Sequence, residues 1–123
     1  MVKVSLNITE GPQKGQNILI EGDRFLIGRS KGELKLKDKK VSGSHCQILI
    51  EDDEVFVEDL NSTNGTFLGS KKITSKEKLE NLDVITVGLS RLTVSILEEL
   101  DEFKAQNSPA ADLAGVETVQ NTN

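Results

Sequence analysis

The sequence predicts an all-β fold, a sandwich or barrel built from many short strands. Apolar and polar residues alternate with a period of two in several segments, as expected for strands with one buried face. Turn-forming residues separate these segments about every ten residues. No helical period appears within residues 1–96. A length of 123 residues gives room for one domain with one core.

The first predicted strand has the clearest pattern. Its apolar members are Val2, Val4, Leu6 and Ile8, and polar residues stand between them. This alternation places one face on a core and the other in water. Turns rich in Gly, Pro and Asp then separate three shorter predicted strands, at residues 17–20, 24–27 and 34–36.

The second half of the chain shows the same kind of pattern. A strand is predicted at residues 45–50, with Cys46, Ile48 and Ile50 on one face, and a turn at residues 51–54 follows it. Residues 76–81 are expected to form at most one short turn of helix. Further strands are predicted at residues 55–57, 66–68, 84–87 and 92–97.

The character of the chain changes near residue 97. We expect residues 1–97 to form the domain and residues 98–123 to form a tail or a linker. The spacing of Leu97, Leu100 and Phe103 among acidic neighbours allows a short amphipathic helix within residues 97–106. From residue 107 onward there is little to bury, which predicts disorder.

The net charge of −5 is unevenly distributed. Residues 1–96 carry 14 basic and 14 acidic residues, whereas residues 97–123 carry six acidic residues and one basic residue. Within the neutral part, six basic residues fall in positions 29–40, and Lys71 and Lys72 follow later. Taken alone, such a run is typical of a solvated loop surface; beside an anion site it would attract acidic ligands.

The sequence also predicts a location. The N-terminus lacks the apolar stretch of a signal peptide, and no run approaches the roughly 18–20 apolar residues that span a bilayer. Cys46 is the single cysteine and cannot form an internal disulfide. A reducing compartment is therefore expected, with the cytoplasm as the default.

Three short motifs fall in predicted loops between strands. They are Gly28-Arg29-Ser30, Ser42-Gly43-Ser44-His45 and Asn61-Ser62-Thr63-Asn64-Gly65-Thr66. Each has a purely structural interpretation, because Arg29 can be a solvated side chain, the second motif an ordinary loop, and Asn64-Gly65 a hairpin turn. The order and spacing of the three motifs distinguish a family pattern from these structural interpretations.

In that order the three motifs resemble the forkhead-associated (FHA) domain family. The family pattern runs Gly-Arg, then Ser-x-x-His, then Ser/Thr-x-Asn-Gly followed by Thr-Phe, and residues 79–88 resemble its closing segment. The resemblance covers about residues 2–97. It implies an FHA-type β-sandwich of about eleven mostly antiparallel strands, whose loops at one end hold phosphothreonine in an extended peptide.

The resemblance also implies roles for single residues. Arg29 and Ser42 would contact the phosphate, Thr63 would lie beside them, and Asn64 would bond the peptide main chain. Arginine suits this task, because its guanidinium presents a fixed fork of donors to phosphate oxygens. The structural members of the motifs would be Gly28, His45 and Gly65.

The remaining predicted contacts concern selectivity and affinity. Lys40 would help to select an acidic residue three positions after the phosphothreonine. Gly43 stands where the family often has Arg or Asn, so it offers only its N–H, and weaker binding or a more mobile loop would follow. Asn61 replaces the usual Gly and tolerates the left-handed conformation well.

Other function classes fit the sequence less well. One His and one Cys cannot supply a zinc site, and no Gly-rich phosphate loop leads into a helix, so we expect no enzyme, no metal and no cofactor. A pI near 4.9 and few aromatic residues argue against nucleic acid. We expect a monomer that binds neither nucleic acid nor a membrane. Its expected partner is a phosphothreonine-containing protein or peptide, a substrate of a Ser/Thr kinase. An unphosphorylated protein partner, or lost phosphate binding, is the alternative.

Overall fold

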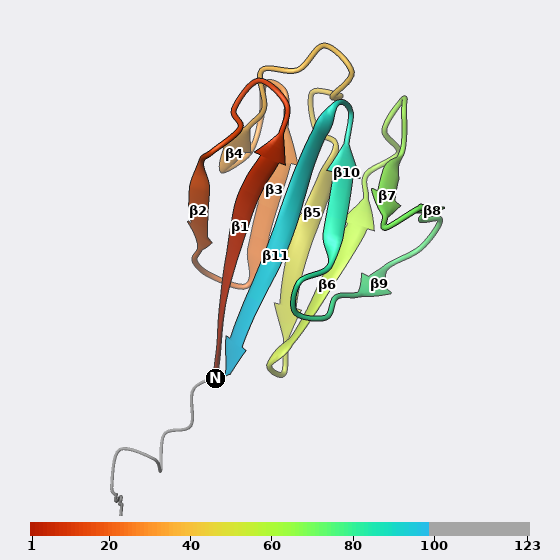
Figure 1. Cartoon of the computed structure of the whole chain (residues 1–123). Coiled ribbons are helices and arrows are strands. Elements are labelled where there is room, and N and C mark those ends of the chain that lie inside the picture. Colours follow the sequence, from red (N-terminus) through yellow and green to blue (C-terminus); the bar gives the residue numbers. More distant parts are fainter. Residues whose placement is uncertain (99–123) are drawn as a thin grey trace, which may run out of the picture.

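The computed structural model describes residues 1–98, which form a sandwich of two β-sheets (Figure 1). The strands of the larger sheet are β1 (Val2–Glu10), β2 (Asn17–Ile20), β7 (Thr66–Leu68), β8 (Lys71–Lys72), β10 (Val84–Val87) and β11 (Ser90–Glu98). The strands of the smaller sheet are β3 (Arg24–Gly28), β4 (Leu34–Lys35), β5 (Cys46–Glu51), β6 (Glu54–Asp59) and β9 (Glu77–Lys78). The orders are β2-β1-β11-β10-β7-β8 and β4-β3-β5-β6-β9.

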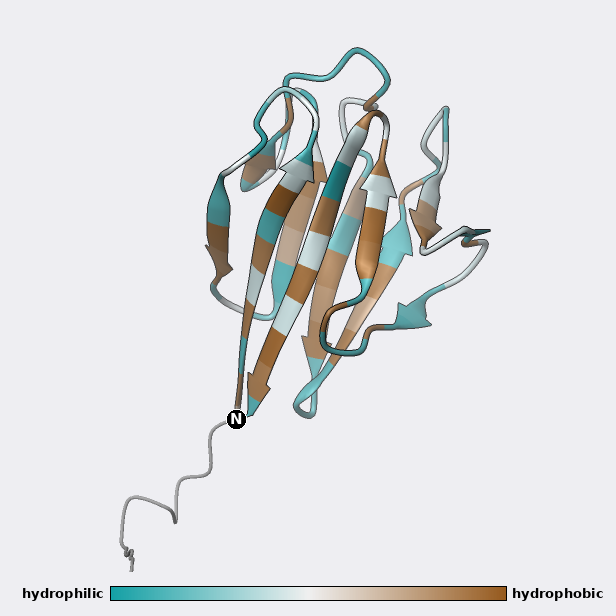
Figure 2. Cartoon of the chain, in the orientation of Figure 1, coloured by the Kyte–Doolittle hydropathy of each residue, from teal (hydrophilic) through white to brown (hydrophobic). Residues whose placement is uncertain are grey.

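This architecture confirms the predicted fold class. Residues 1–98 contain eleven strands, and among their pairings only β3 with β4 is parallel. The two long strands β1 and β11 pair from Val2 opposite Glu98 to Ile8 opposite Leu92. Apolar and polar residues alternate along both strands (Figure 2), and the apolar residues Val4, Leu6 and Val94 are fully buried between the sheets.

The connection from β6 to β7 leads from the smaller sheet to the larger one. Asn64 and Gly65 therefore do not form a hairpin turn, and that interpretation of the sequence is wrong. Gly65 does have a φ of 84°, as a hairpin residue would. Its carbonyl, however, is bonded to His45 at the start of β5, so contacts with another loop determine its conformation.

The segment predicted to hold a turn of helix forms the edge strand β9 instead. Glu77 and Lys78 pair with Val57 and Phe56 of β6. The next residue, Leu79, is buried, and its N–H donates to the carbonyl of Val55 at 2.7 Å. Burial of Leu79 and pairing with an open strand edge outweigh the weak helical tendency of so short a segment.

The predicted turn residues behave as expected. Asp52 and Asp53 have φ values of 51° and 65° in the tight connection between β5 and β6. Asn61, with φ of 60°, adopts the left-handed conformation in which a glycine is usual. Each of these residues takes a backbone shape that Asn and Asp tolerate better than most side chains.

The end of the described chain corrects one expectation. Leu97 and Glu98 close β11, so the segment proposed as a helix begins in a strand, and the rest of residues 97–106 lies outside the described residues. The predicted disordered segment 107–123 and the linker also lie outside them. Within residues 1–98 there is no helix that could cross a membrane.

The upper end of the sandwich in Figure 1 carries the connections that contain the three motifs. They are residues 29–33, 36–45 and 60–65, and we call this end the loop end. The first residues of β1 and the last residues of β11 lie at the opposite end.

One exposed residue is strained and offers a stability test. Leu82 has φ of 74° and is 67% exposed, so its side chain gains little from burial while its backbone is held in the left-handed region. We expect Leu82→Asn to raise the free energy of unfolding by about 0.5–1 kcal/mol. Urea denaturation measures this change.

Leu89→Asn is the matched control. Leu89 is 64% exposed, but it is not among the residues with positive φ, so the same change of side chain should not stabilise the protein. Equal effects of the two substitutions would show that the more polar side chain, and not the relief of backbone strain, is responsible.

Candidate functional site

The first two loops of the loop end are joined through their backbones. The Arg29 N–H donates to the Ser42 carbonyl at 2.8 Å, and the Lys31 N–H donates to the Gly43 carbonyl at 3.1 Å. Gly28 makes this approach possible, because a Cβ there would collide with the carbonyl oxygens of Gly43 and Lys31. Any larger residue at position 28 would separate Arg29 from Ser42.

The third loop is bonded to the second by two side chains. The Thr63 N–H donates to Oγ of Ser42 at 3.0 Å, and Nδ2 of Asn64 donates to the Lys40 carbonyl at 2.8 Å. In the first bond the Ser42 oxygen is the acceptor, so its own proton is left for another acceptor. Asn64 likewise keeps its Oδ1 and one N–H for a ligand.

A buried histidine connects the same two loops from beneath. Nδ1 of His45 accepts the Ser42 N–H at 3.0 Å, and Nε2 lies 2.8 Å from the Gly65 carbonyl. These partners require a neutral ring with its proton on Nε2, which donates to Gly65. Because His45 is fully buried, its contribution is to hold the loops and not to touch a ligand.

Asp59, at the end of β6, organises the third loop. One carboxylate oxygen accepts the hydroxyls of Ser62 and Thr66, both at 2.6 Å, and the other accepts the Ser62 N–H at 3.1 Å. Partial burial acts to raise the pKa of Asp59, but the hydrogen bonds from Ser62 and Thr66 outweigh it and hold this pKa below its usual value. The ionised carboxylate therefore stabilises the loop.

Asp38 plays a similar part for the second loop. Its buried carboxylate accepts the N–H groups of Lys40 and Leu89, at 2.9 and 2.8 Å, and the hydroxyl of Ser90 at 2.9 Å. The loop is thereby fastened to the turn between β10 and β11. No sequence motif indicates these structural roles of Asp38 and Asp59, because an acid that supports a loop resembles any surface acid in sequence.

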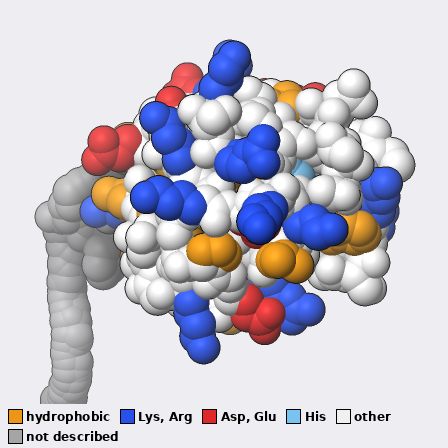
Figure 3. Space-filling view, turned by 90° about the horizontal axis from the view of Figure 1, so that it is seen from above, with side chains coloured by type: hydrophobic (Ala, Val, Ile, Leu, Met, Phe, Trp, Pro, Cys, Tyr) orange, Lys and Arg blue, Asp and Glu red, His pale blue; other side chains and the backbone are white. Residues whose placement is uncertain are grey.

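The loop end is electrostatically positive. Many Lys and Arg side chains and few acidic ones gather on the face seen from above in Figure 3. Arg29, Lys31 and Lys40 are exposed, and within the described part of the chain none of them has an ion-pair or side-chain hydrogen-bond partner. Lys72 adds a further cation near the third loop, since its side chain packs against Gly65. The three motifs did not indicate this residue.

The predicted site residues thus lie on loops that meet at one end of the sandwich. Lys40, Ser42 and Gly43 belong to the second loop, Arg29 to the first, and Thr63 and Asn64 to the third. Together they offer a guanidinium, hydroxyls, an amide and an ammonium group. Two acidic residues of these loops are hydrogen-bonded within the domain: Glu33 accepts the Leu26 N–H, and Asp38 accepts from Lys40, Leu89 and Ser90. Such a set of donors suits a small, doubly charged anion.

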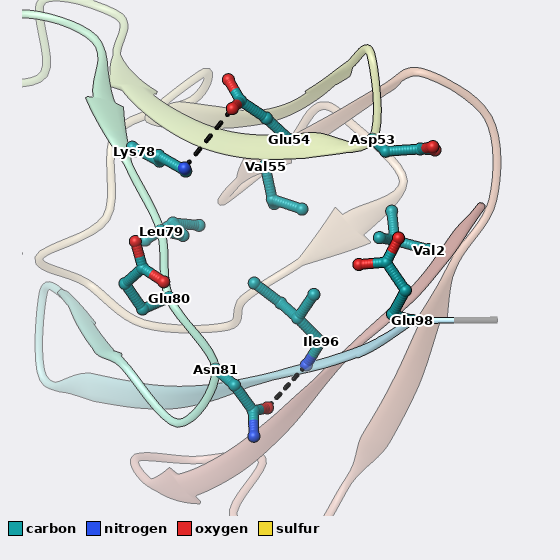
Figure 4. Close-up of a pocket in the computed structure, with 10 residues that line it drawn as sticks. All are labelled: Val2, Asp53, Glu54, Val55, Lys78, Leu79, Glu80, Asn81, Ile96 and Glu98. Atoms are coloured by element: carbon teal, nitrogen blue, oxygen red, sulfur yellow. Dashed lines mark hydrogen bonds and ion pairs between the residues drawn. The ribbon is translucent and has the colours of Figure 1, made fainter. Parts of the chain in front are cut away.

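The other end of the sandwich has the opposite chemistry. A cleft of about 350 Å³ there has apolar walls that include Val55 and Ile96, and a rim with the acidic residues Asp53, Glu80 and Glu98 (Figure 4). Its acidic rim would repel an anionic ligand. This cleft is therefore a poor candidate for an anion site.

The described residues provide little for catalysis. Burial raises the pKa of the Cys46 thiol to about 12, so the thiolate is not available as a nucleophile. No cluster of three or more His, Cys, Asp or Glu residues within positions 1–98 could hold a metal ion.

The low pKa of Asp59 makes a pH prediction. A carboxyl whose pKa is lower in the folded than in the unfolded state stabilises the fold above its unfolded value, about 3.9, and loses that effect as the pH falls through the folded value. We expect Asp59→Asn to cost about 1–2 kcal/mol of unfolding free energy at pH 7 and much less at pH 3. Urea unfolding at both pH values measures the difference.

Asp52→Asn is the control for this experiment. Asp52 lies exposed in a hairpin turn whose left-handed backbone Asn also adopts, so its loss should change stability little at either pH. A cost for Asp59→Asn that is the same at pH 3 and pH 7 would contradict a stabilising role of the charge.

Comparisons with known proteins agree with this geometry. The FHA domain family model matches residues 25–88. The FHA domain-containing protein FhaB of Mycobacterium tuberculosis is 39% identical over 71 residues, which are 57% of this chain and 46% of FhaB. The chain spans about half the length of the curated relatives it matches.

Two solved structures are similar over nearly their whole length. A domain from a structural and functional analysis of phosphothreonine-dependent FHA domain interactions has a TM-score of 0.68 and 28% identity, and the match covers 80% of this chain and 99% of that one. The FhaA FHA domain, complexed with the intracellular domain of a second protein, has a TM-score of 0.66 and 29% identity, covering 74% and 98%. With the family match and the eleven-stranded sandwich, these similarities show that the chain belongs to the forkhead-associated domain family.

Proposed function

We propose that this domain binds phosphothreonine in a partner protein through the loop end and acts as a protein-interaction module in signalling or regulation. The observation that carries the proposal is the hydrogen bonding that joins Arg29, Ser42 and Thr63 across three loops. Arg29 and Lys40 are the cations of the site, Ser42 and Thr63 supply hydroxyls, and Asn64 bonds the peptide backbone.

The chemistry of phosphothreonine matches this set. Its phosphate carries a charge of about −1.5 to −2 at pH 7 and presents several acceptor oxygens. Arg29 can donate two parallel hydrogen bonds to such a group, and the hydroxyl proton of Ser42 remains for a third. Because the site's cations have no internal ion pairs to break within the described residues, binding does not have to disrupt the fold.

Two comparisons support the proposal. One similar structure belongs to a study of phosphothreonine-dependent FHA domain interactions, and another FHA domain was solved bound to an intracellular protein domain. Both describe FHA domains in interactions with other molecules. We therefore propose that this domain has no catalytic activity of its own, in keeping with its inert Cys46.

Gly43 supports a second candidate function. With no side chain at this position the phosphate site has one potential donor fewer, so the domain could serve an unphosphorylated partner. Titration with a phosphothreonine peptide, its phosphoserine analogue and its unphosphorylated form separates the two. Equal affinity for all three peptides would favour the second function.

Substitution of Arg29 tests the main proposal directly. We expect Arg29→Ala to weaken binding of a phosphothreonine peptide by about a hundredfold or more, since each hydrogen bond to a charged group contributes about 1.5–3 kcal/mol. Its melting temperature should stay the same, because only the Arg29 backbone is bonded within the domain. Isothermal titration calorimetry and a melting curve measure the two effects.

Arg24→Ala is the matched control. Arg24 is exposed on the same strand as Gly28 but begins it, at the end away from the loops, so its loss should leave affinity within about twofold. Unchanged binding by Arg29→Ala would remove Arg29 from the site.

Gly43 offers a test in the opposite direction. A Cβ at this position would meet only the Ser30 hydroxyl, at 3.2 Å, and Ser30 is exposed and can turn away. We expect Gly43→Arg to fold normally and to bind the phosphothreonine peptide about three- to tenfold more tightly, as an added exposed ion pair would allow. A gain that persists for the unphosphorylated peptide would show that the new side chain does not read the phosphate.

A further inference from the structure

The segment from the last residue of β4 to the second motif carries a row of lysines. Lys35, Lys37 and Lys39 are exposed, whereas the residues between them, Leu36 and Asp38, are buried. We call these three lysines the lysine row. Along this segment exposed and buried residues alternate, and the Asp38 N–H donates to the Leu36 carbonyl at 2.9 Å, so the backbone turns at Lys37 while all three lysines stay exposed.

The backbone beneath the lysine row is held at several points. Leu36 N–H donates to the Gly28 carbonyl at 2.8 Å, and Lys37 N–H donates to Oε1 of Gln13 at 2.7 Å. Asp38 is bonded to the turn between β10 and β11, and the Lys40 carbonyl accepts from Asn64. The backbone that carries the row is therefore held by hydrogen bonds from the edge strand β4 to the third loop of the candidate site.

The side chains of the lysine row take part in no ion pair within the described part of the chain. None of the ion pairs within residues 1–98 includes them, whereas Lys71, Lys76 and Lys78 are each paired with a glutamate. Two acidic residues lie near the row in sequence, and both accept hydrogen bonds within the fold: Glu33 accepts the Leu26 N–H, and Asp38 is buried with its own donors. The row is thus an open set of cations.

We infer that the lysine row binds an anionic segment next to the phosphothreonine in the partner. The proposed ligand is a peptide stretch with several negative side chains, because the three exposed lysines follow closely along a hydrogen-bonded backbone and take part in no ion pair within residues 1–98. Carboxylates and further phosphates share this chemistry. The inference rests on the proposed function and adds a second, separate determinant of partner choice.

The test uses the full chain and compares phosphothreonine peptides, two of which are acidic isomers of equal charge. One phosphothreonine peptide has neutral flanks, a second carries three aspartates at alternate positions on the amino-terminal side, and a third carries them on the carboxyl-terminal side. A fourth replaces the aspartates of the tighter peptide with phosphoserines. We expect one acidic isomer to bind about tenfold more tightly than the neutral peptide, and the gain to shrink as salt is raised.

The variant Lys35→Gln/Lys37→Gln/Lys39→Gln locates the effect. It should lose that gain and bind the neutral peptide within about twofold of the unaltered protein. The control Arg24→Gln/Lys76→Gln/Lys78→Gln changes the net charge equally at the opposite end of the sandwich and should keep the preference. The phosphoserine peptide then tells whether the row prefers phosphates to carboxylates.

Several results would overturn the inference. Equal gains for both acidic isomers, or the same loss in the control variant, would indicate general charge attraction and not the lysine row. If a DNA oligonucleotide binds more tightly than the acidic peptide, and the lysine-row variant loses that binding, the row is a nucleic-acid site instead. If no phosphothreonine peptide binds, the proposed function fails. If the phosphothreonine peptides bind but the neutral and acidic ones have equal affinity, only the inference about the lysine row fails.

Discussion

The arrangement of the loop end depends on one imidazole. His45 accepts the Ser42 N–H with one nitrogen and donates to the Gly65 carbonyl with the other, at 3.0 and 2.8 Å. The ring is fully buried, so an unmet donor or acceptor there would be costly, and both loops are held where they satisfy it. The neutral form with its proton on Nε2 is the one that makes both bonds.

Two buried or partly buried carboxylates extend the same design. Asp38 fastens the second loop to the β10–β11 turn, and Asp59 gathers Ser62 and Thr66 around the third loop. These acids accept hydrogen bonds from backbone N–H groups and hydroxyls and not from lysine ammonium groups. The acidic groups at this end are therefore used for structure, and the exposed cations of the described residues keep their charge for a ligand.

The alternation of apolar and polar residues was enough to predict the long strands, because each has one face in the core. β8 and β9 are two residues long and carry no period, so only their partners in the sheet define them. The pair Asn64-Gly65 has the same backbone preference in a hairpin and in a crossing loop, and local sequence cannot separate these. Arg29, Ser42 and Thr63 were found by their order in a family pattern, whereas Asp38 and Asp59 were missed because a supporting acid looks like any surface acid.

The antiparallel pairing of β1 with β11 brings Val2 opposite Glu98, at the end farthest from the three loops. A polypeptide joined to the sandwich through either of these strands would leave from the same pole. The loops at the other pole would stay open to a partner whatever the size of that attachment. The site of attachment and the candidate binding surface therefore lie at opposite ends of one core, so a neighbouring domain can be attached without any change in the loops.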